Sequence, residues 1–214
     1  MKRFQYSILA LLVISVYSQA FASGFAVSAK LGSLGGGAEL TRSISQKWNA
    51  RLGYNYASYS FGNTLQGKDV KYDAEIAWGS VTLFGDWFPY EGSFHISPGL
   101  VYNNNELGLR VDPTETYTVG NRQYGPETLG SVSGKIDFNK FAPYLGIGWG
   151  NPVSHDKRFG MTLDLGAFYQ SSPKVTMTGE GMIAPTANQA PKIEDKLSGA
   201  LVYLVVSLGF TFQL

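Results

Sequence analysis

The chain has no cysteine among its 214 residues. This absence excludes a disulfide framework, a thiolate metal site and a cysteine nucleophile. The chain also lacks an excess of charge of either sign, because it has 17 Lys and Arg residues and 16 Asp and Glu residues. A near-neutral chain has no basic field for nucleic acid, so a nucleic-acid partner is not expected. Beyond the N-terminus no apolar run approaches the length of a transmembrane helix, which takes about 20 residues.

The N-terminal segment has the three parts of an export signal. Lys2 and Arg3 precede an apolar run over residues 8–16, and Ala20-Phe21-Ala22 fits the small-x-small site of signal peptidase. An N-terminal anchor is the alternative, but this run is too short to cross roughly 30 Å of hydrocarbon. The sequence therefore predicts a cleavable signal peptide over residues 1–22 and one exported domain over residues 23–214.

Apolar residues recur at every second position in many segments. The clearest is the last, where one face carries Val202, Leu204, Val206, Leu208, Phe210, Phe212 and Leu214. A helix would spread these residues around its surface, whereas a strand places them on one side. The same alternation holds over residues 48–56, 93–103 and 160–170. The chain is also rich in Gly, Tyr and Phe, and the pattern favours an all-β fold of half-apolar strands.

Some strands change phase along their length. The apolar residues at 74, 76 and 78 give way to 81, 83 and 87, and those at 136 and 138 give way to 145, 147 and 149. We expect a β-bulge at each change, and a further bulge at Pro98. Residues 24–45 allow either two strands around a turn at residues 33–37 or one bent strand. Because bacterial single-chain barrels have an even strand count, eight strands are preferred to seven.

The connections alternate in length. Short connections are expected at residues 45–47, 89–92 and 151–158, and long ones at 62–71, 104–134 and 172–196; the first connection, at 33–37, departs from this pattern. Aromatic side chains on the apolar face gather at both strand ends, with Trp48, Trp87 and Trp149 at the short-turn end and Tyr56, Tyr102 and Tyr169 near the other. Two aromatic girdles and this alternation predict an eight-stranded antiparallel up-and-down transmembrane β-barrel. A soluble β-sandwich or a lipocalin-like barrel explains the alternation but not two outward aromatic rings.

The C-terminal strand resembles the assembly signal of bacterial outer-membrane barrels, with Ser207, Gly209, Phe212 and Leu214 in its positions, although the usual last residue is Phe. Residues 52–56 and 141–150 are similar to strands of small eight-stranded barrels, such as the membrane domain of outer membrane protein A and outer membrane protein W. This resemblance implies the bacterial outer membrane as the location. It also implies contact with outer-membrane lipid and lipopolysaccharide, and recognition by periplasmic chaperones and the barrel-assembly machinery.

Charged residues occupy inward positions of the predicted strands: Lys30, Glu39, Arg51, Asp86, His95 and Asp164. The interior of an eight-stranded barrel is just wide enough to be filled by side chains. Charges shut away from water must pair, so we expect an internal polar network that fills the lumen. The alternative is a path for protons or small ions through the same residues.

No pattern of catalytic, cofactor-binding or metal-binding residues stands out. His95 and Ser97 have the spacing seen in outer-membrane lipid A deacylases, but both are expected to point inward, away from lipid. Gly35-Gly36-Gly37 lacks the lysine and helix of a phosphate-binding loop. The sequence favours a non-enzymatic barrel whose external loops serve recognition or envelope integrity. A narrow porin-like channel for small or apolar solutes is the first alternative, and a lipid A-modifying hydrolase is the second.

Overall fold

A computed structural model describes residues 24–64, 70–113, 116–119, 122–153, 158–199 and 201–214. The expected signal peptide lies outside the described residues, as do parts of the connections 62–71 and 151–158. Among the described residues, none of the helices combines the length and apolar character needed to cross a membrane.

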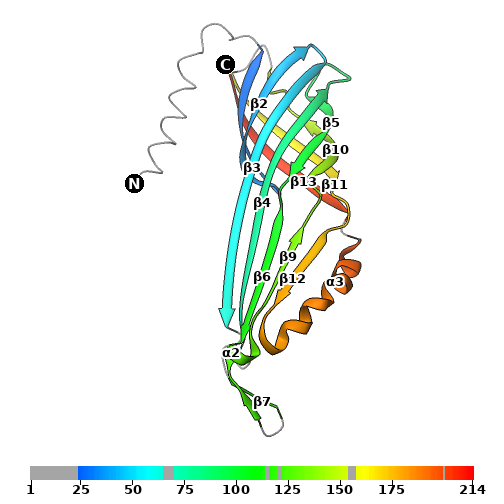
Figure 1. Cartoon of the computed structure of the whole chain (residues 1–214). Helices are drawn as coiled ribbons and strands as arrows, with labels where there is room; N and C mark the ends of the chain where they lie inside the picture. The colour runs from blue at the N-terminus through cyan, green and yellow to red at the C-terminus, as the bar shows by residue number, and fades with distance from the viewer. Residues whose placement is uncertain (1–23, 65–69, 114–115, 120–121, 154–157, 200) are drawn as a thin grey trace, which may run out of the picture.

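Antiparallel strands close into a barrel (Figure 1). Its eight strands in ring order are β1 (Phe25–Gly32), β2 (Gly35–Ser45), β3 (Trp48–Thr64), β4 (Val70–Trp87), β5 (Phe94–Asn103), β10 (Phe141–Trp149), β11 (Phe159–Tyr169) and β13 (Val202–Gln213). β13 pairs with both β11 and β1, which completes the ring. The predicted fold, an antiparallel eight-stranded transmembrane β-barrel, is confirmed.

The first hairpin decides the strand count. β1 and β2 are separate strands that pair from Phe25↔Arg42 to Gly32↔Gly35, so the turn between them is Ser33-Leu34. This turn is shorter than the predicted one. Gly35 follows it with φ +96°, a conformation that side chains rarely adopt. The single bent strand that would have left seven strands is therefore not formed.

The barrel continues at one end into an open sheet. β3 and β4 run beyond the ring, and β6 (Glu106–Pro113), β9 (Val132–Asp137) and β12 (Lys174–Gly179) extend the sheet in the order β3-β4-β6-β9-β12. η1 (Gly181–Gln189) and α3 (Ala190–Leu197) lie over β9 and β12 (Figure 1). A small hairpin, β7 (Tyr117–Val119) and β8 (Arg122–Tyr124), and the short helix α2 (Pro126–Leu129) complete this part, which we call the extension.

The extension corrects the prediction that residues 104–134 and 172–196 are loops. Both segments carry apolar residues at every second position, such as Leu107, Leu109 and Val111, and these pair with β4. The connection predicted at residues 62–71 is also shorter, because β3 ends at Thr64 and β4 begins at Val70. The long connections are thus largely ordered secondary structure.

The expected bulge in β4 is wrong. β3 and β4 pair in one register from Trp48↔Trp87 to Thr64↔Lys71, without a shift. The apolar residues change face because the surroundings change. Inside the ring the outward side, with Leu83, is apolar. In the extension the opposite side, with Ile76, is apolar, and this is the side on which η1 and α3 cover β9 and β12. The second expected bulge is also absent, since residues 136 and 145 belong to the separate strands β9 and β10.

Pro98 lies in β5 without a bulge. Phe84↔Gly99 and Trp87↔Ile96 of β4 and β5 keep the same register on both sides of it. The two residue pairs between them are missing from the ladder, which accommodates a residue that has no N–H to donate. On its other side Pro98 pairs with Leu145 of β10.

The outer surface of the ring is apolar, and the inner surface is mostly polar. Trp48, Trp87 and Trp149 are exposed on the outside near the short-turn end, where the Trp48 and Trp87 rings lie 6.4 Å apart on neighbouring strands. Tyr56, Tyr102 and Tyr169 are exposed on the same outer surface. These positions suit the two interfaces of a bilayer.

Candidate functional site in the barrel lumen

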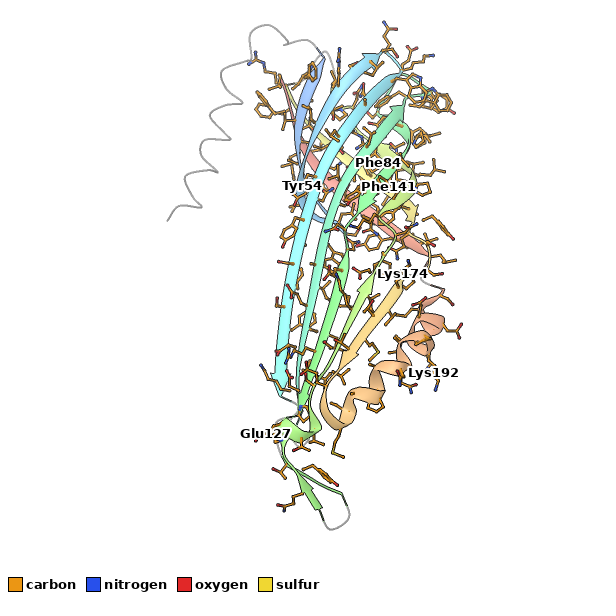
Figure 2. All side chains as sticks on the ribbon, viewed as in Figure 1. Tyr54, Phe84, Glu127, Phe141, Lys174 and Lys192 are labelled. Atoms are coloured by element: carbon orange, nitrogen blue, oxygen red, sulfur yellow. The ribbon has the colours of Figure 1, made fainter. Side chains whose placement is uncertain are left out.

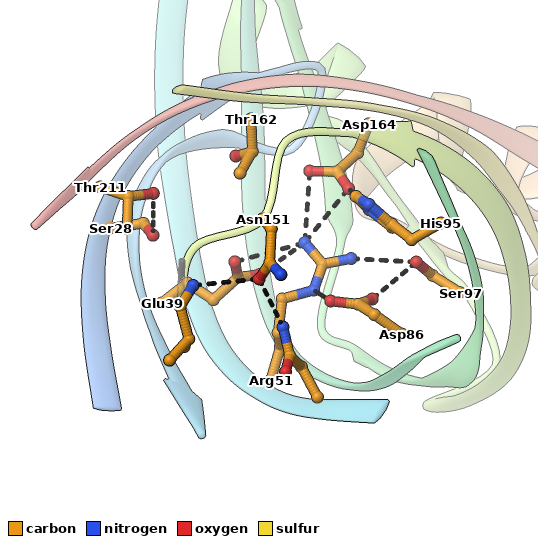
Figure 3. Close-up of polar contacts among 12 residues, drawn as sticks. Ser28, Glu39, Arg51, Asp86, His95, Ser97, Asn151, Thr162, Asp164 and Thr211 are labelled. Atoms are coloured by element: carbon orange, nitrogen blue, oxygen red, sulfur yellow. Dashed lines mark hydrogen bonds and ion pairs between the residues drawn. The ribbon is translucent and has the colours of Figure 1, made fainter. Parts of the chain in front are cut away.

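Six ionisable side chains from six strands meet inside the barrel, and Figure 3 labels all of them except Lys30. They are the residues predicted for the lumen: Lys30 of β1, Glu39 of β2, Arg51 of β3, Asp86 of β4, His95 of β5 and Asp164 of β11. None is more than 6% exposed. Alternation along each strand points every second side chain inward, so the closed ring brings together groups that lie far apart in the sequence.

Arg51 lies at the centre of this network. Its Nε is 2.7 Å from Asp86 Oδ2, and its Nη1 is 3.3 Å from Glu39 Oε1 and 3.1 Å from Asp164 Oδ1. Its Nη2 donates to the hydroxyl of Ser97 at 3.2 Å. A guanidinium can serve several carboxylates at once because its five N–H groups form a fixed planar fork. Arg51 thereby joins its own strand, β3, to four others.

Lys30 and His95 complete the network around Asp164. Lys30 donates to Asp164, and its Nζ is 3.7 Å from Glu39 Oε1. His95 Nε2 is 3.2 Å from Asp164 Oδ1, and Nδ1 is 3.4 Å from the carbonyl oxygen of Ser93. Both of these partners are hydrogen-bond acceptors, so the two ring nitrogens of His95 face one carboxylate oxygen and one carbonyl oxygen. Lys30, Arg51 and His95 thus surround the three carboxylates of the network.

The His95 and Ser97 pair does not form a nucleophilic relay. Ser97 donates to Asp86 Oδ1 at 2.7 Å, whereas His95 bonds Asp164. A hydrolase of the serine type needs the imidazole to take the proton of the serine hydroxyl. Both side chains are fully enclosed in the lumen, at 0% and 1% exposure. This geometry serves packing and charge pairing rather than attack on a lipid.

An apolar layer, which the sequence analysis missed, closes the lumen on the side of the extension. The rings of Phe84 and Tyr144 stack at 4.2 Å, and those of Phe168 and Tyr203 stack at 5.0 Å. The guanidinium of Arg51 lies 5.3 Å from the centre of the Phe84 ring, which joins this layer to the polar network. A sequence signal existed, because Phe168 breaks the outward alternation of its strand.

Little free space remains in the lumen. The cavity between the two layers, lined by Lys30, Glu39, Phe84 and Tyr144 among others, has a volume of about 20 Å³. This volume holds little more than one water molecule. At the short-turn end Phe88, 1% exposed, packs against His95 with ring centres 5.1 Å apart. Among the described residues, the interior is filled by side chains.

The four residues of the expected assembly signal lie along β13. Ser207 donates to Asp164 Oδ2 at 3.4 Å. Gly209 lies against the Lys30 side chain, because a Cβ at this position would come within 2.9 Å of it. Phe212 is exposed on the outer surface, and the backbone N–H of Leu214 donates to Phe25 at 3.0 Å. Their recognition by the assembly machinery remains a prediction.

One face of the extension carries exposed charges. Arg110 pairs with Asp112 at 2.9 Å, and Lys135 pairs with Glu106 at 2.9 Å and with Asp137 at 3.3 Å. Hydrogen bonds to Glu106 and Asp137 raise the pKa of Lys135. These residues lie at alternate positions of β6 and β9, on the face away from η1 and α3. The extension therefore presents a polar, solvent-exposed surface beyond the barrel.

Comparisons with known proteins support the fold. No family model matches the sequence, and no curated protein matches it. The crystal structure of Acinetobacter baumannii CarO2 is 20% identical, covers 90% of this chain and 99% of that chain, and gives a TM-score of 0.57. The crystal structure of Acinetobacter baumannii CarO is 22% identical, covers 89% of this chain and 98% of that chain, and gives a TM-score of 0.55. Both structures are outer-membrane β-barrels, so the chain shares their fold.

Proposed function

We propose that this chain is a non-enzymatic outer-membrane protein with a closed lumen, which displays the extension outside the cell for recognition. One observation carries the proposal. The lumen is filled by a polar network and an aromatic layer, while an ordered five-stranded sheet stands beyond one end of the ring. A closed barrel is a rigid scaffold, and variable segments on a rigid scaffold concentrate binding.

Several features support the location and orientation. The outer surface of the ring is apolar and carries aromatic side chains at both ends, as the interfaces of a bilayer favour. The N-terminal sequence has the pattern of an export signal, which fits delivery to the periplasm. The first described residues and the C-terminus lie at the short-turn end, and the extension lies at the other (Figure 1). We infer contact of the ring with lipid and lipopolysaccharide, and assembly by periplasmic chaperones and the barrel-assembly machinery.

The porin-like channel has less support. A pore requires a continuous path, whereas the cavity between the polar network and the stacked rings of Phe84 and Tyr144 has a volume of only about 20 Å³. Lipid A hydrolysis has still less support, because Ser97 donates to Asp86 inside the lumen and is out of reach of lipid. Neither alternative explains why the sheet extends beyond the ring.

Cysteine labelling tests the orientation, and the absence of native cysteine makes it clean. Lys192 is exposed on α3 of the extension (Figure 2), and Lys47 is exposed in the short β2–β3 turn. With a membrane-impermeant maleimide on intact cells, Lys192→Cys is expected to react. Lys47→Cys, the matched control, is expected to react only after the cells are lysed. Labelling of Lys47→Cys but not of Lys192→Cys on intact cells would contradict the proposal.

A further inference from the structure

An apolar cavity lies between the sheet of the extension and its helical layer. It has a volume of about 400 Å³, and its walls include Leu107 and Leu109 of β6, Ile136 of β9, Met177 of β12, Ile183 of η1 and Ile193 of α3. We call this space the slot. Ligand cavities in proteins commonly have volumes of about 300–1,000 Å³, and this one is within that range. A helix layer that packed closely on the sheet would leave no such gap.

The helical layer contacts β9 and β12 and is joined to the sheet by hydrogen bonds on both sides of the slot. At the far end Glu180 donates its backbone N–H to Ser131 at 2.8 Å, beside Gly130 and Gly181, which both have positive φ. On the other side the backbone N–H of Val175 donates to Glu194 Oε2 at 3.2 Å. No side chain of η1 or α3 is fully buried. The slot lies between these two attachments.

The chemistry of the walls selects the ligand. The lining side chains are branched aliphatic groups and Met177, and Thr186 is the one that carries a hydrogen-bonding group. None of the described residues that line the slot has an aromatic ring or a charged side chain. A polar ligand would lose its hydrogen bonds to water without replacement, which is costly. An aromatic ligand would find no ring to stack on, so the walls suit an aliphatic chain.

The shape and place of the slot agree with this. Along β6 the lining runs from Leu107 to Val111, which is about 13 Å at the rise of a β-strand. A space of this length fits an extended hydrocarbon chain. β4 changes partner from β5 at Ser80 to β6 at Ala77, so the slot begins only about 10 Å beyond the ring. A chain held here would lie close to the outer surface of the membrane.

We propose that the slot binds the aliphatic chain of a single-chain amphiphile, with its polar head outside. The proposal rests on display of the extension outside the cell, which the cysteine labelling of Lys192 and Lys47 tests separately. It does not depend on the state of the lumen. The bound chain would complete the apolar layer that η1 and α3 leave open.

Photocrosslinking tests the proposal on the full protein in phospholipid vesicles. The probe is dodecanoic acid with a diazirine near its methyl end, and the crosslinked peptides are identified by mass spectrometry. We expect crosslinks to residues 132–136, 175–177 and 183–193, and competition by unmodified dodecanoic acid. A probe phospholipid in the same vesicles is expected to label only the outer surface of the ring. Labelling of the slot by the phospholipid alone, or of the ring alone by both probes, would overturn the proposal.

Paired substitutions on one strand make the test specific. Met177 lines the slot, and Thr176 points to the other face of β12. Met177→Trp fills the slot and is expected to lower the crosslinking yield at least tenfold, whereas Thr176→Trp leaves it unchanged. Leu109→Ala enlarges the slot. In this variant hexadecanoic acid is expected to compete with the probe more strongly than dodecanoic acid does. Equal crosslinking yields in Met177→Trp and Thr176→Trp, together with unchanged competition by the two fatty acids in Leu109→Ala, would show that the slot does not bind the chain.

Discussion

At the scale of single residues, Arg51 is the key to the lumen. It is 1% exposed and faces three buried carboxylates, those of Glu39, Asp86 and Asp164. Removal of one partner from a buried network leaves charges that neither water nor protein compensates. The polar network should therefore depend on Arg51 far more than on any exposed ion pair of this protein.

Arg51→Met, a change of similar length without the charge, is expected to lower the free energy of unfolding by about 3–5 kcal/mol. Urea unfolding in vesicles, followed by tryptophan fluorescence, measures this loss. Lys47→Met is the control, because Lys47 pairs with Glu91 at 3.1 Å on the surface with both side chains half exposed. A surface pair of this kind contributes at most about 1 kcal/mol. Equal losses in the two variants would refute the central role of Arg51.

The alternation of inward and outward side chains along each strand explains which residues of the lumen could be predicted from the sequence. Lys30, Arg51 and Asp164 are charged residues at inward positions of clear strands, and a closed ring has one interior for them to share. The aromatic layer was missed because Phe84, Tyr144 and Phe168 are apolar residues on the polar face. Alternation alone treats such residues as exceptions, whereas the closed ring requires bulk there to fill its interior.

At the scale of elements, β3 and β4 pass through two environments in one unbroken ladder. Within the ring their lipid side is apolar, with Leu52 and Leu83, and in the extension the same side carries Ser60 and Glu75. The alternation predicts that a segment is a strand with one apolar face. It does not tell on which side of the sheet the apolar face lies. The same alternation of apolar and polar residues results whether that face contacts lipid or a helical layer. The bulge predicted in β4 was wrong for this reason.

Two substitutions on one face of β3 test the change of environment. Leu52→Lys places a charge on the lipid side of the ring and is expected to lower the free energy of unfolding by about 2–4 kcal/mol if Leu52 lies near the middle of the bilayer. Ser60→Lys lies on the same side of the strand, eight positions further along, in solvent. It is expected to change stability by less than about 0.5 kcal/mol. Unfolding in vesicles measures both, and similar losses would place residue 60 within the membrane.

At the scale of the whole molecule, the ring and the extension have different roles. The cavity that the described residues leave in the lumen is only about 20 Å³, so the charges and aromatic side chains of the ring stabilise a scaffold. The extension adds three strands to the sheet, a small hairpin, a helical layer and the slot at one end of that scaffold. The sequence predicted the long segments that build the extension but interpreted them as loops. Pairing between β4, β6, β9 and β12 joins residues far apart in the chain, and a local pattern does not specify such partners.

Conductance of the purified protein in a planar lipid bilayer tests the closed lumen most directly. Vesicles are fused to the bilayer, and the current is recorded at steady voltage with an open porin as the positive control. The filled lumen predicts no steady conductance from this protein under conditions in which the porin gives stepwise openings. Discrete, reproducible openings of the protein itself would contradict a closed barrel and favour a channel.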